Sequence, residues 1–289
     1  MKIRFKTMLF TALVTAMVVC SGPLTARAEE KQPEYGWQKE MVGGINLTQT
    51  SFDNWAQGGE NSFAWQLNFN FKFVREEEKT NWANSGKFNY GSTKIGDEGS
   101  RKSIDEVRFE SVLTYKLWPL INPYVSVMGV TQFAPGYDYG TDPKIQISAF
   151  FDPAYFRESA GVNYKPNEII KTRAGFSIKQ TVTTDFPVPY ADDPTTPGVE
   201  KTKNEIGAES VTDLSWKVAE SMLFTSKLEL FSAFKTLDAT DVDWDNLFTA
   251  KISKYFDVNL NFRLLYDKDI SSRRQIKQAI ALGVTYNFL

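Results

Sequence analysis

Residues 63–73, "FAWQLNFNFKF", alternate large apolar and mostly polar side chains without a break. Successive side chains of a β-strand point to opposite faces, so this pattern predicts a strand with one apolar and one polar face. The apolar face meets either a protein core or lipid. It consists of Phe63, Trp65, Leu67, Phe69, Phe71 and Phe73.

The N-terminus predicts export. A basic start over residues 2–6 precedes an apolar run over residues 8–19, and "LTARA" then ends at Ala28. This order is typical of a secretory signal peptide, and the run is shorter than the about 20 residues that span a bilayer as a helix. We predict a signal peptide over residues 1–28, cleaved after Ala28, followed by a periplasmic N-terminal tail over residues 29–40.

Removal of the signal peptide changes the composition. Cys20, the only cysteine, leaves with it, and the chain has no histidine. Disulfides, thiolate or imidazole metal ligands and His-based catalytic relays are therefore excluded. The remaining 29 basic and 35 acidic residues give a formal charge of −6, which argues against nucleic acid as a partner. A lipoprotein with a lipid on Cys20 stays open as an alternative, although Val19 stands where that processing prefers a small residue.

The rest of the sequence shows one strand pattern after another, and no later segment is apolar enough for a transmembrane helix. Bacterial outer-membrane barrels have an even number of antiparallel strands. We predict an all-β fold over residues 41–289, a transmembrane up-and-down barrel of about 12 strands. The predicted strands are 41–50, 62–73, 82–93, 105–117, 123–133, 154–165, 170–183, 203–218, 223–235, 244–255, 258–267 and 275–288.

Connection lengths favour a membrane barrel over a soluble sandwich. Residues 134–153 and 184–202 form long connections, whereas residues 165–169 and 218–222 form short ones, and long and short alternate along the chain. Outer-membrane barrels have long extracellular loops and short periplasmic turns. All twelve prolines also lie outside the predicted strand interiors, as β-ladders require.

Aromatic residues gather near the predicted short turns and the C-terminus. Trp and Tyr prefer the membrane interface, where an apolar ring and a polar tip are both satisfied. We therefore predict one aromatic girdle on the periplasmic side, made of Trp82, Tyr115, Trp118, Tyr124, Tyr164, Trp216, Tyr255 and Tyr286.

The C-terminal "GVTYNFL" is similar to the assembly signal of outer-membrane barrels, in which a glycine precedes two alternating aromatics. Gly283, Tyr286 and Phe288 match it, although Leu289 is last and Ala281 stands where a polar residue is usual. The resemblance implies the barrel-assembly machinery as a partner and outer-membrane lipid as the environment of the apolar face.

The stretch before the opening strand carries a second resemblance. Asn54, Trp55, Gly58 and Gly59 resemble the Asn-Trp-x-x-Gly-Gly signature of predicted outer-membrane barrels labelled domain of unknown function 3078. The likeness extends from about Trp37 through the fourth strand and more loosely to the end. It implies fold and location, and the family has no activity to transfer. The glycines permit positive φ in a tight loop, while Trp55 either caps the first hairpin or contacts a ligand.

The stretch "DATDVDWDN" has the Asp-x-Asp-x-Asp spacing of a calcium loop at Asp241, Asp243 and Asp245. Asn246 stands where the loop needs glycine, and Ile252 where it needs glutamate. The alternative is that the three carboxylates share the lumen face of one strand. We favour the lumen interpretation and predict no metal and no other cofactor.

The polar faces predict a lumen lined by both signs of charge, which indicates no ion preference. Eight strands enclose a lumen that side chains fill and 16 to 18 leave an aqueous channel, so a barrel of twelve is a narrow pore or is closed by salt bridges. The predicted lumen residues are Lys72, Arg108, Glu110, Lys116, Arg173, Glu209, Asp213, Lys227, Glu229, Lys251, Arg263 and Lys277.

Three functions compete for such a barrel in the outer membrane of a Gram-negative bacterium. The first is a channel or transporter for small polar solutes, because pores are a common use of barrels with polar interiors. The second is a structural or surface-interaction barrel that acts through its loops. The third, an enzyme, is restricted to carboxylate chemistry by the lack of histidine, and we predict none. A soluble periplasmic β-protein remains the alternative at the level of the fold, and the sequence identifies no solute.

Overall fold

The computed structural model describes residues 35–289 except 54–58, 237–238, 269–270, 272 and the side chain of Pro189. The predicted signal peptide lies outside these residues. In the described part of the chain, no helix is long and apolar enough to cross a membrane.

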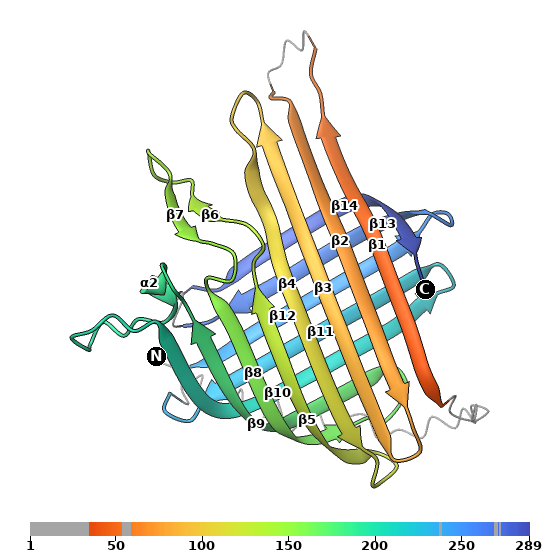
Figure 1. Cartoon of the computed structure of the whole chain (residues 1–289). Helices are drawn as coiled ribbons and strands as arrows, with labels where there is room; N and C mark the ends of the chain where they lie inside the picture. Colours follow the sequence, from red (N-terminus) through yellow and green to blue (C-terminus); the bar gives the residue numbers. More distant parts are fainter. Residues whose placement is uncertain (1–34, 54–58, 237–238, 269–270, 272) are drawn as a thin grey trace, which may run out of the picture. The chain divides into compact units, whose positions relative to one another are not determined.

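Twelve strands close into one antiparallel barrel in which neighbours along the chain are neighbours in the wall (Figure 1). The predicted fold class is confirmed. The barrel strands are β1 (Gly36–Thr50), β2 (Ser62–Glu76), β3 (Thr80–Ile95), β4 (Arg101–Tyr115), β5 (Ile121–Thr131), β8 (Ala154–Tyr164), β9 (Ile170–Val182), β10 (Thr202–Ala219), β11 (Met222–Ala233), β12 (Thr240–Lys251), β13 (Phe256–Tyr266) and β14 (Gln275–Asn287).

Three regions of the structure differ from the prediction. β1 begins at Gly36, so residues 36–40 belong to the wall and not to the predicted tail. The reason is backbone pairing, since Gly36 lies opposite Glu76 at the end of a longer β2. In the predicted loop 134–153, β6 (Gly136–Asp138) and β7 (Ile145–Ser148) pair as a separate two-stranded sheet. The loop between β9 and β10 contains the short helix α2 (Pro187–Tyr190).

The two ends of the barrel differ in the length of their connections. We call the end with the brief connections, 77–79, 116–120, 165–169, 220–221 and 252–255, the short-turn end. The opposite end, the long-loop end, carries the connections 51–61, 96–100, 132–153, 183–201, 234–239 and 267–274.

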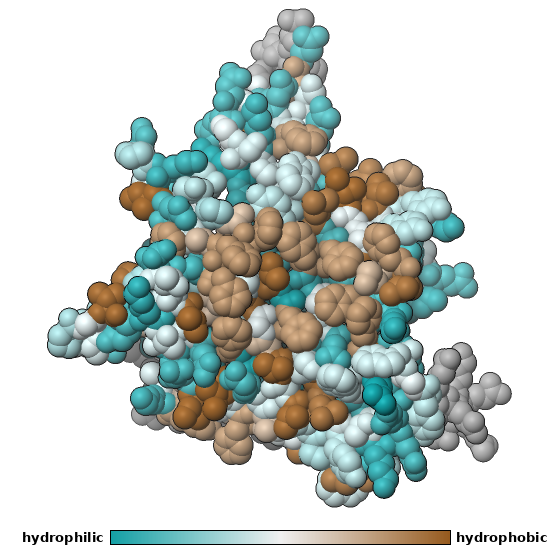
Figure 2. Space-filling view, in the orientation of Figure 1, coloured by the Kyte–Doolittle hydropathy of each residue, from teal (hydrophilic) through white to brown (hydrophobic). Residues whose placement is uncertain are grey.

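The outer face of the wall is apolar. Leu260, Ile280 and Leu282 point outward and are 46%, 71% and 52% exposed, and apolar side chains cover much of the face in Figure 2. Polar groups on this face are satisfied by neighbours. The indole Nε1 of Trp82 donates to Ser111 Oγ at 2.9 Å, and that of Trp244 donates to Ser226 Oγ at 3.0 Å. The outer surface therefore has the character of a lipid-facing wall.

Seven of the eight predicted girdle residues are exposed near the short-turn end, and one prediction is wrong. Tyr124 is 3% exposed, and its hydroxyl donates to Glu209 Oε1 at 3.1 Å inside the barrel. The physical reason is strand parity, because Val125 and Val127 of β5 point outward and Tyr124 therefore points inward.

Candidate functional site

Strands from opposite walls bring their charged side chains together in the lumen. β4 and β12 lie opposite each other, since six steps separate them in either direction around the ring of twelve. Alternation directs Glu106, Arg108 and Glu110 of β4 inward, and it does the same for Asp243 and Asp245 of β12. The ion pair between Arg108 of β4 and Asp243 of β12 therefore crosses the full width of the barrel.

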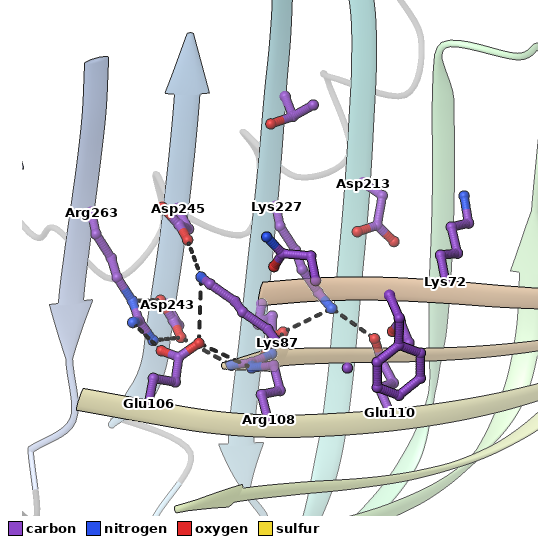
Figure 3. Close-up of a pocket in the computed structure, with 16 residues that line it drawn as sticks. Lys72, Lys87, Glu106, Arg108, Glu110, Asp213, Lys227, Asp243, Asp245 and Arg263 are labelled. Carbon is purple, nitrogen blue, oxygen red and sulfur yellow. Dashed lines mark hydrogen bonds and ion pairs between the residues drawn. The ribbon is translucent and has the colours of Figure 1, made fainter. Parts of the chain in front are cut away.

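The centre of this arrangement is a group of four residues that we call the partition: Arg108, Glu229, Asp243 and Arg263. Arg108 Nη1 lies 2.5 Å from Glu229 Oε1, and its Nη2 lies 3.5 Å from Asp243 Oδ2. Arg263 Nη2 lies 2.8 Å from the same Asp243 oxygen. Figure 3 shows Arg263, Asp243 and Arg108 converging from different strands.

Further ion pairs extend the partition in both directions. Glu106 accepts a bond from Arg263 Nη1 at 2.5 Å, and Lys87 Nζ of β3 lies 3.2 Å from Asp245 Oδ2. On the other side, Glu110 lies 2.8 Å from Lys227 Nζ and also pairs with Arg173. The lumen is thus crossed by a continuous network of alternating charges.

The partition separates two cavities. The inner cavity, about 430 Å³, lies toward the short-turn end and is lined by Lys72, Ser85 and Thr225 among others. The outer cavity, about 250 Å³, lies toward the long-loop end and is lined by Tyr155 and Phe231 among others. All four partition residues line both cavities. The partition therefore stands where a solute moving along the barrel axis would have to pass.

The charges of the partition are shielded from solvent and balanced. The side chains of Arg108 and Glu229 are 14% and 5% exposed, and each contacts more than one opposite charge. Removal of one partner from a buried ion pair costs about 3–5 kcal/mol, because the other charge stays buried without compensation. The network is therefore stable when complete and sensitive to the loss of a single charge.

The structure places most of the predicted lumen residues inside the barrel. Lys72 and Asp213 line the inner cavity. Lys277 Nζ donates to the carbonyl of Ser103 at 3.4 Å. Two residues lie instead at the short-turn rim, where strands end: Lys116 follows the last residue of β4 and pairs with Glu76, and Lys251 is the exposed last residue of β12.

The three aspartates of the calcium-like spacing lie in β12 and meet different cations. Asp241 accepts from Lys179 Nζ at 2.6 Å, whereas Asp243 and Asp245 contact Arg263 and Lys87. In the described part of the chain no three acidic side chains converge as metal ligands. A strand spreads alternate side chains along one face, so the calcium alternative does not fit this geometry.

The two sequence motifs have different outcomes. Asn54, Trp55 and Gly58 lie outside the described residues. Gly59 has a φ of +136°, as expected for a glycine that permits positive φ. In the C-terminal motif, a Cβ on Gly283 would lie 2.4 Å from Asp257 Oδ1 and 2.6 Å from Asn46 Oδ1, so a larger residue there requires these side chains to move.

The other two residues of the C-terminal motif lie on the surface. Tyr286 and Phe288 are 55% and 56% exposed, and the Phe288 amide donates to the carbonyl of Met41 at 2.8 Å.

Sequence reasoning missed three charged residues of the network: Lys87, Glu106 and Arg157. Glu106 stands two positions before Arg108, so continued alternation along β4 identifies it. Arg157 lines the outer cavity, and its Nη1 lies 3.5 Å from Glu229 Oε2. Its strand lacks the regular apolar pattern of the others, because Glu158 interrupts the outward face.

Two family models match the chain. Residues 135–288, more than half of the chain, match "Protein of unknown function, DUF481". The chain belongs to the DUF481 family. Residues 47–137 match "Protein of unknown function (DUF3078)", which confirms the resemblance based on the Asn-Trp-x-x-Gly-Gly signature. No curated protein matches the sequence of this DUF481 member.

Several solved structures are similar in fold. The translocator domain of autotransporter NalP from Neisseria meningitidis is 10% identical over 89% of this chain and 90% of its own, with a TM-score of 0.42. The COG4313 outer membrane channel from Pseudomonas putida F1 is 8% identical over 92% and 99%, with a TM-score of 0.41. The NanC porin is 8% identical over 86% and 98%, with a TM-score of 0.40.

Proposed function

We propose that this DUF481 protein is a channel for small polar solutes in the outer membrane of a Gram-negative bacterium, held closed by the partition. The observation that carries the proposal is the pair of cavities on either side of four balanced charges. The two cavities leave room for a small solute on each side of the partition.

The outer wall supports the membrane location. Its apolar face, the exposed aromatics near the short-turn end and the unequal connections match the pattern of outer-membrane barrels. In this orientation the short-turn end is periplasmic and the long-loop end extracellular. The proposed partners are outer-membrane lipid along the wall and the barrel-assembly machinery at the exposed C-terminal aromatics. We propose no enzymatic activity.

The lining supports small polar solutes. The inner cavity combines Lys72, Asn70 and Ser85 with the charges of the network, so it offers donors and acceptors of both signs. Passage requires that Arg108 part from Glu229 or Asp243, which opens the axis between the cavities. A polar solute compensates the separated charges during passage, whereas an apolar one leaves them unpaired at a cost.

Conductance across a planar bilayer tests the proposal. We expect low conductance for the wild type and a clear increase for the double variant R108Q/E229Q, which removes both charges of the shortest pair in the partition. The control is K251Q, which changes a charge at the exposed rim. If the double variant folds, as shown by a heat-dependent shift in electrophoretic mobility, and conducts no more than the wild type, the proposal fails.

One observation favours the second candidate, a barrel that acts through its loops. The Asp152 carboxylate accepts the amides of Thr184 at 3.1 Å and Asp185 at 2.7 Å, so it ties the two longest loops together. Deletion of Val188–Gly198 separates the two candidates. Conductance that persists or rises supports the channel, whereas a non-conducting protein that loses a cell-surface phenotype supports the loops.

A further inference from the structure

The wall closes at the junction of β1 and β14, and this junction is paired over only part of its length. Val42–Leu47 pair with Leu282–Asn287. β1 nevertheless continues to Thr50, and β14 begins at Gln275. In Figure 1 the two strands run apart toward the long-loop end. We call residues 48–50 and 275–281 the open seam.

An unpaired strand edge is unusual in a membrane wall. Backbone N–H and C=O groups cannot be left in hydrocarbon without partners, and closed barrels remove such edges. Residues 275–281 pair with β13 on one side, and among the described residues no backbone hydrogen bond joins their other side to β1. These groups therefore depend on water from the lumen or on the polar part of a ligand.

Part of the open seam on β14 has small side chains inside and large apolar ones outside. The inward positions of β14 include Lys277, whose Nζ reaches the carbonyl of Ser103, and then Ala279 and Ala281, which leave room inside. The outward positions are Ile276 and Ile280, which are 51% and 71% exposed, with the exposed Gln278 between them. On β14 the slit is therefore bordered by two isoleucines and a glutamine on the lipid side and, beyond Lys277, by two alanines on the lumen side.

The slit leads to the outer cavity. Gln275, the first residue of β14, lines that cavity together with Leu265 and Tyr266 of β13. The same cavity contains the charged Lys179 and Asp267. A molecule that enters from the side thus meets the isoleucine side chains of β14 first and charged groups further in.

From this arrangement we infer that the open seam is a lateral opening through which the alkyl chain of an amphipathic molecule moves between the outer leaflet and the outer cavity. We assign the outer leaflet because the unpaired segment of β14 lies toward the long-loop end, which the proposed function places outside the cell. The inference rests on the membrane location of the proposed function, and it adds a second class of ligand to the polar solutes of the axial route. The partition blocks that ligand from going further along the axis.

Fluorescence quenching by brominated lipid tests the lateral opening. The described chain has no cysteine, so A279C and I280C each carry a single bimane label. The matched control is A83C, which is inward-facing on β3 and paired on both sides, to Val74 and Val112. In vesicles of dibrominated phosphatidylcholine, we expect strong quenching at positions 279 and 280 and little at 83. Quenching at position 279 as weak as at 83 would overturn the inference.

Cross-linking across the junction provides a second readout that needs no label. Q49C/I280C continues the observed register beyond the last pair, and I45C/V284C occupies an observed outward pair. Under copper–phenanthroline oxidation we expect the second variant to cross-link and the first to remain open. Equal cross-linking of both variants would show a closed wall and overturn the inference.

The same experiments distinguish failure of the inference from failure of the channel proposal. Strong quenching at position 279 in a protein that never conducts would support the lateral opening and refute the channel proposal. Conductance through the R108Q/E229Q variant without quenching at position 279 would refute the lateral opening and support the channel proposal.

Discussion

Leu260 and Asn261 are adjacent residues of β13 that point to opposite faces of the wall. Leu260 is outward and 46% exposed, and it lies opposite Phe248 on β12 and Ile280 on β14. Asn261 is inward, and its Nδ2 donates to Asp245 Oδ1 at 2.7 Å and to the carbonyl of Asn246 at 3.0 Å. The same substitution, to arginine, therefore tests which face meets lipid.

The expected costs differ because the two surroundings differ. Near the bilayer centre, Leu260→Arg places a charge in hydrocarbon, which costs about 2–4 kcal/mol. Asn261→Arg removes two hydrogen bonds but brings a cation next to Asp245, so we expect a net cost of about 1 kcal/mol or less. The difference arises from the environment of the side chain and not from its size.

Urea titration in lipid vesicles, followed by tryptophan fluorescence, measures both costs as changes in the free energy of unfolding. We expect L260R to lower it clearly more than N261R. If N261R proves as destabilising as L260R or more so, the assignment of inside and outside is reversed or the wall does not face lipid.

Three further results are expected. Glu229→Ala leaves Arg108, Lys227 and Arg157 without their shared carboxylate, so the free energy of unfolding should fall by about 3–5 kcal/mol. The control Glu168→Ala removes an exposed pair and should change the free energy of unfolding by about 0–1 kcal/mol. Equal effects of the two substitutions would contradict the buried network. Protease added to intact cells should cut residues 134–153 and 184–202 before the short turns 77–79 and 220–221, and early cleavage in the short turns would reverse the topology. Leu282→Arg should impair assembly as L260R does, whereas Thr285→Arg, inward on the same strand, should not, as judged by the amount of heat-shifted protein in outer-membrane fractions.

The strands could be predicted from the sequence because each one separates two environments. The alternation of apolar and polar side chains, such as Leu260 and Asn261, indicates the two environments. The twelve predicted spans correspond to the twelve barrel strands. Most charges of the lumen were predictable for the same reason, whereas Lys87, Glu106 and Arg157 were missed. The inward direction of Tyr124 was not predictable, because it depends on the residue at which β5 begins, and no alternating polar run precedes that residue.

The partners of each charge could not be predicted. That Arg108 meets Asp243, 135 residues further along the chain, follows from the position of β4 opposite β12 in the closed ring. The partial pairing of β1 with β14 depends in turn on the lengths and tilts of both strands. Local sequence carries no information on either, because both are properties of the closed wall.

Access to the lumen from outside the cell tests the central claim most directly. T225C places a single thiol in the inner cavity, and L265C places one in the outer cavity. A small membrane-impermeant methanethiosulfonate cation added to intact cells should modify L265C and spare T225C, and T225C should become reactive when combined with R108Q/E229Q. Equal modification of both thiols in the otherwise unchanged chain would show that no partition separates the two cavities.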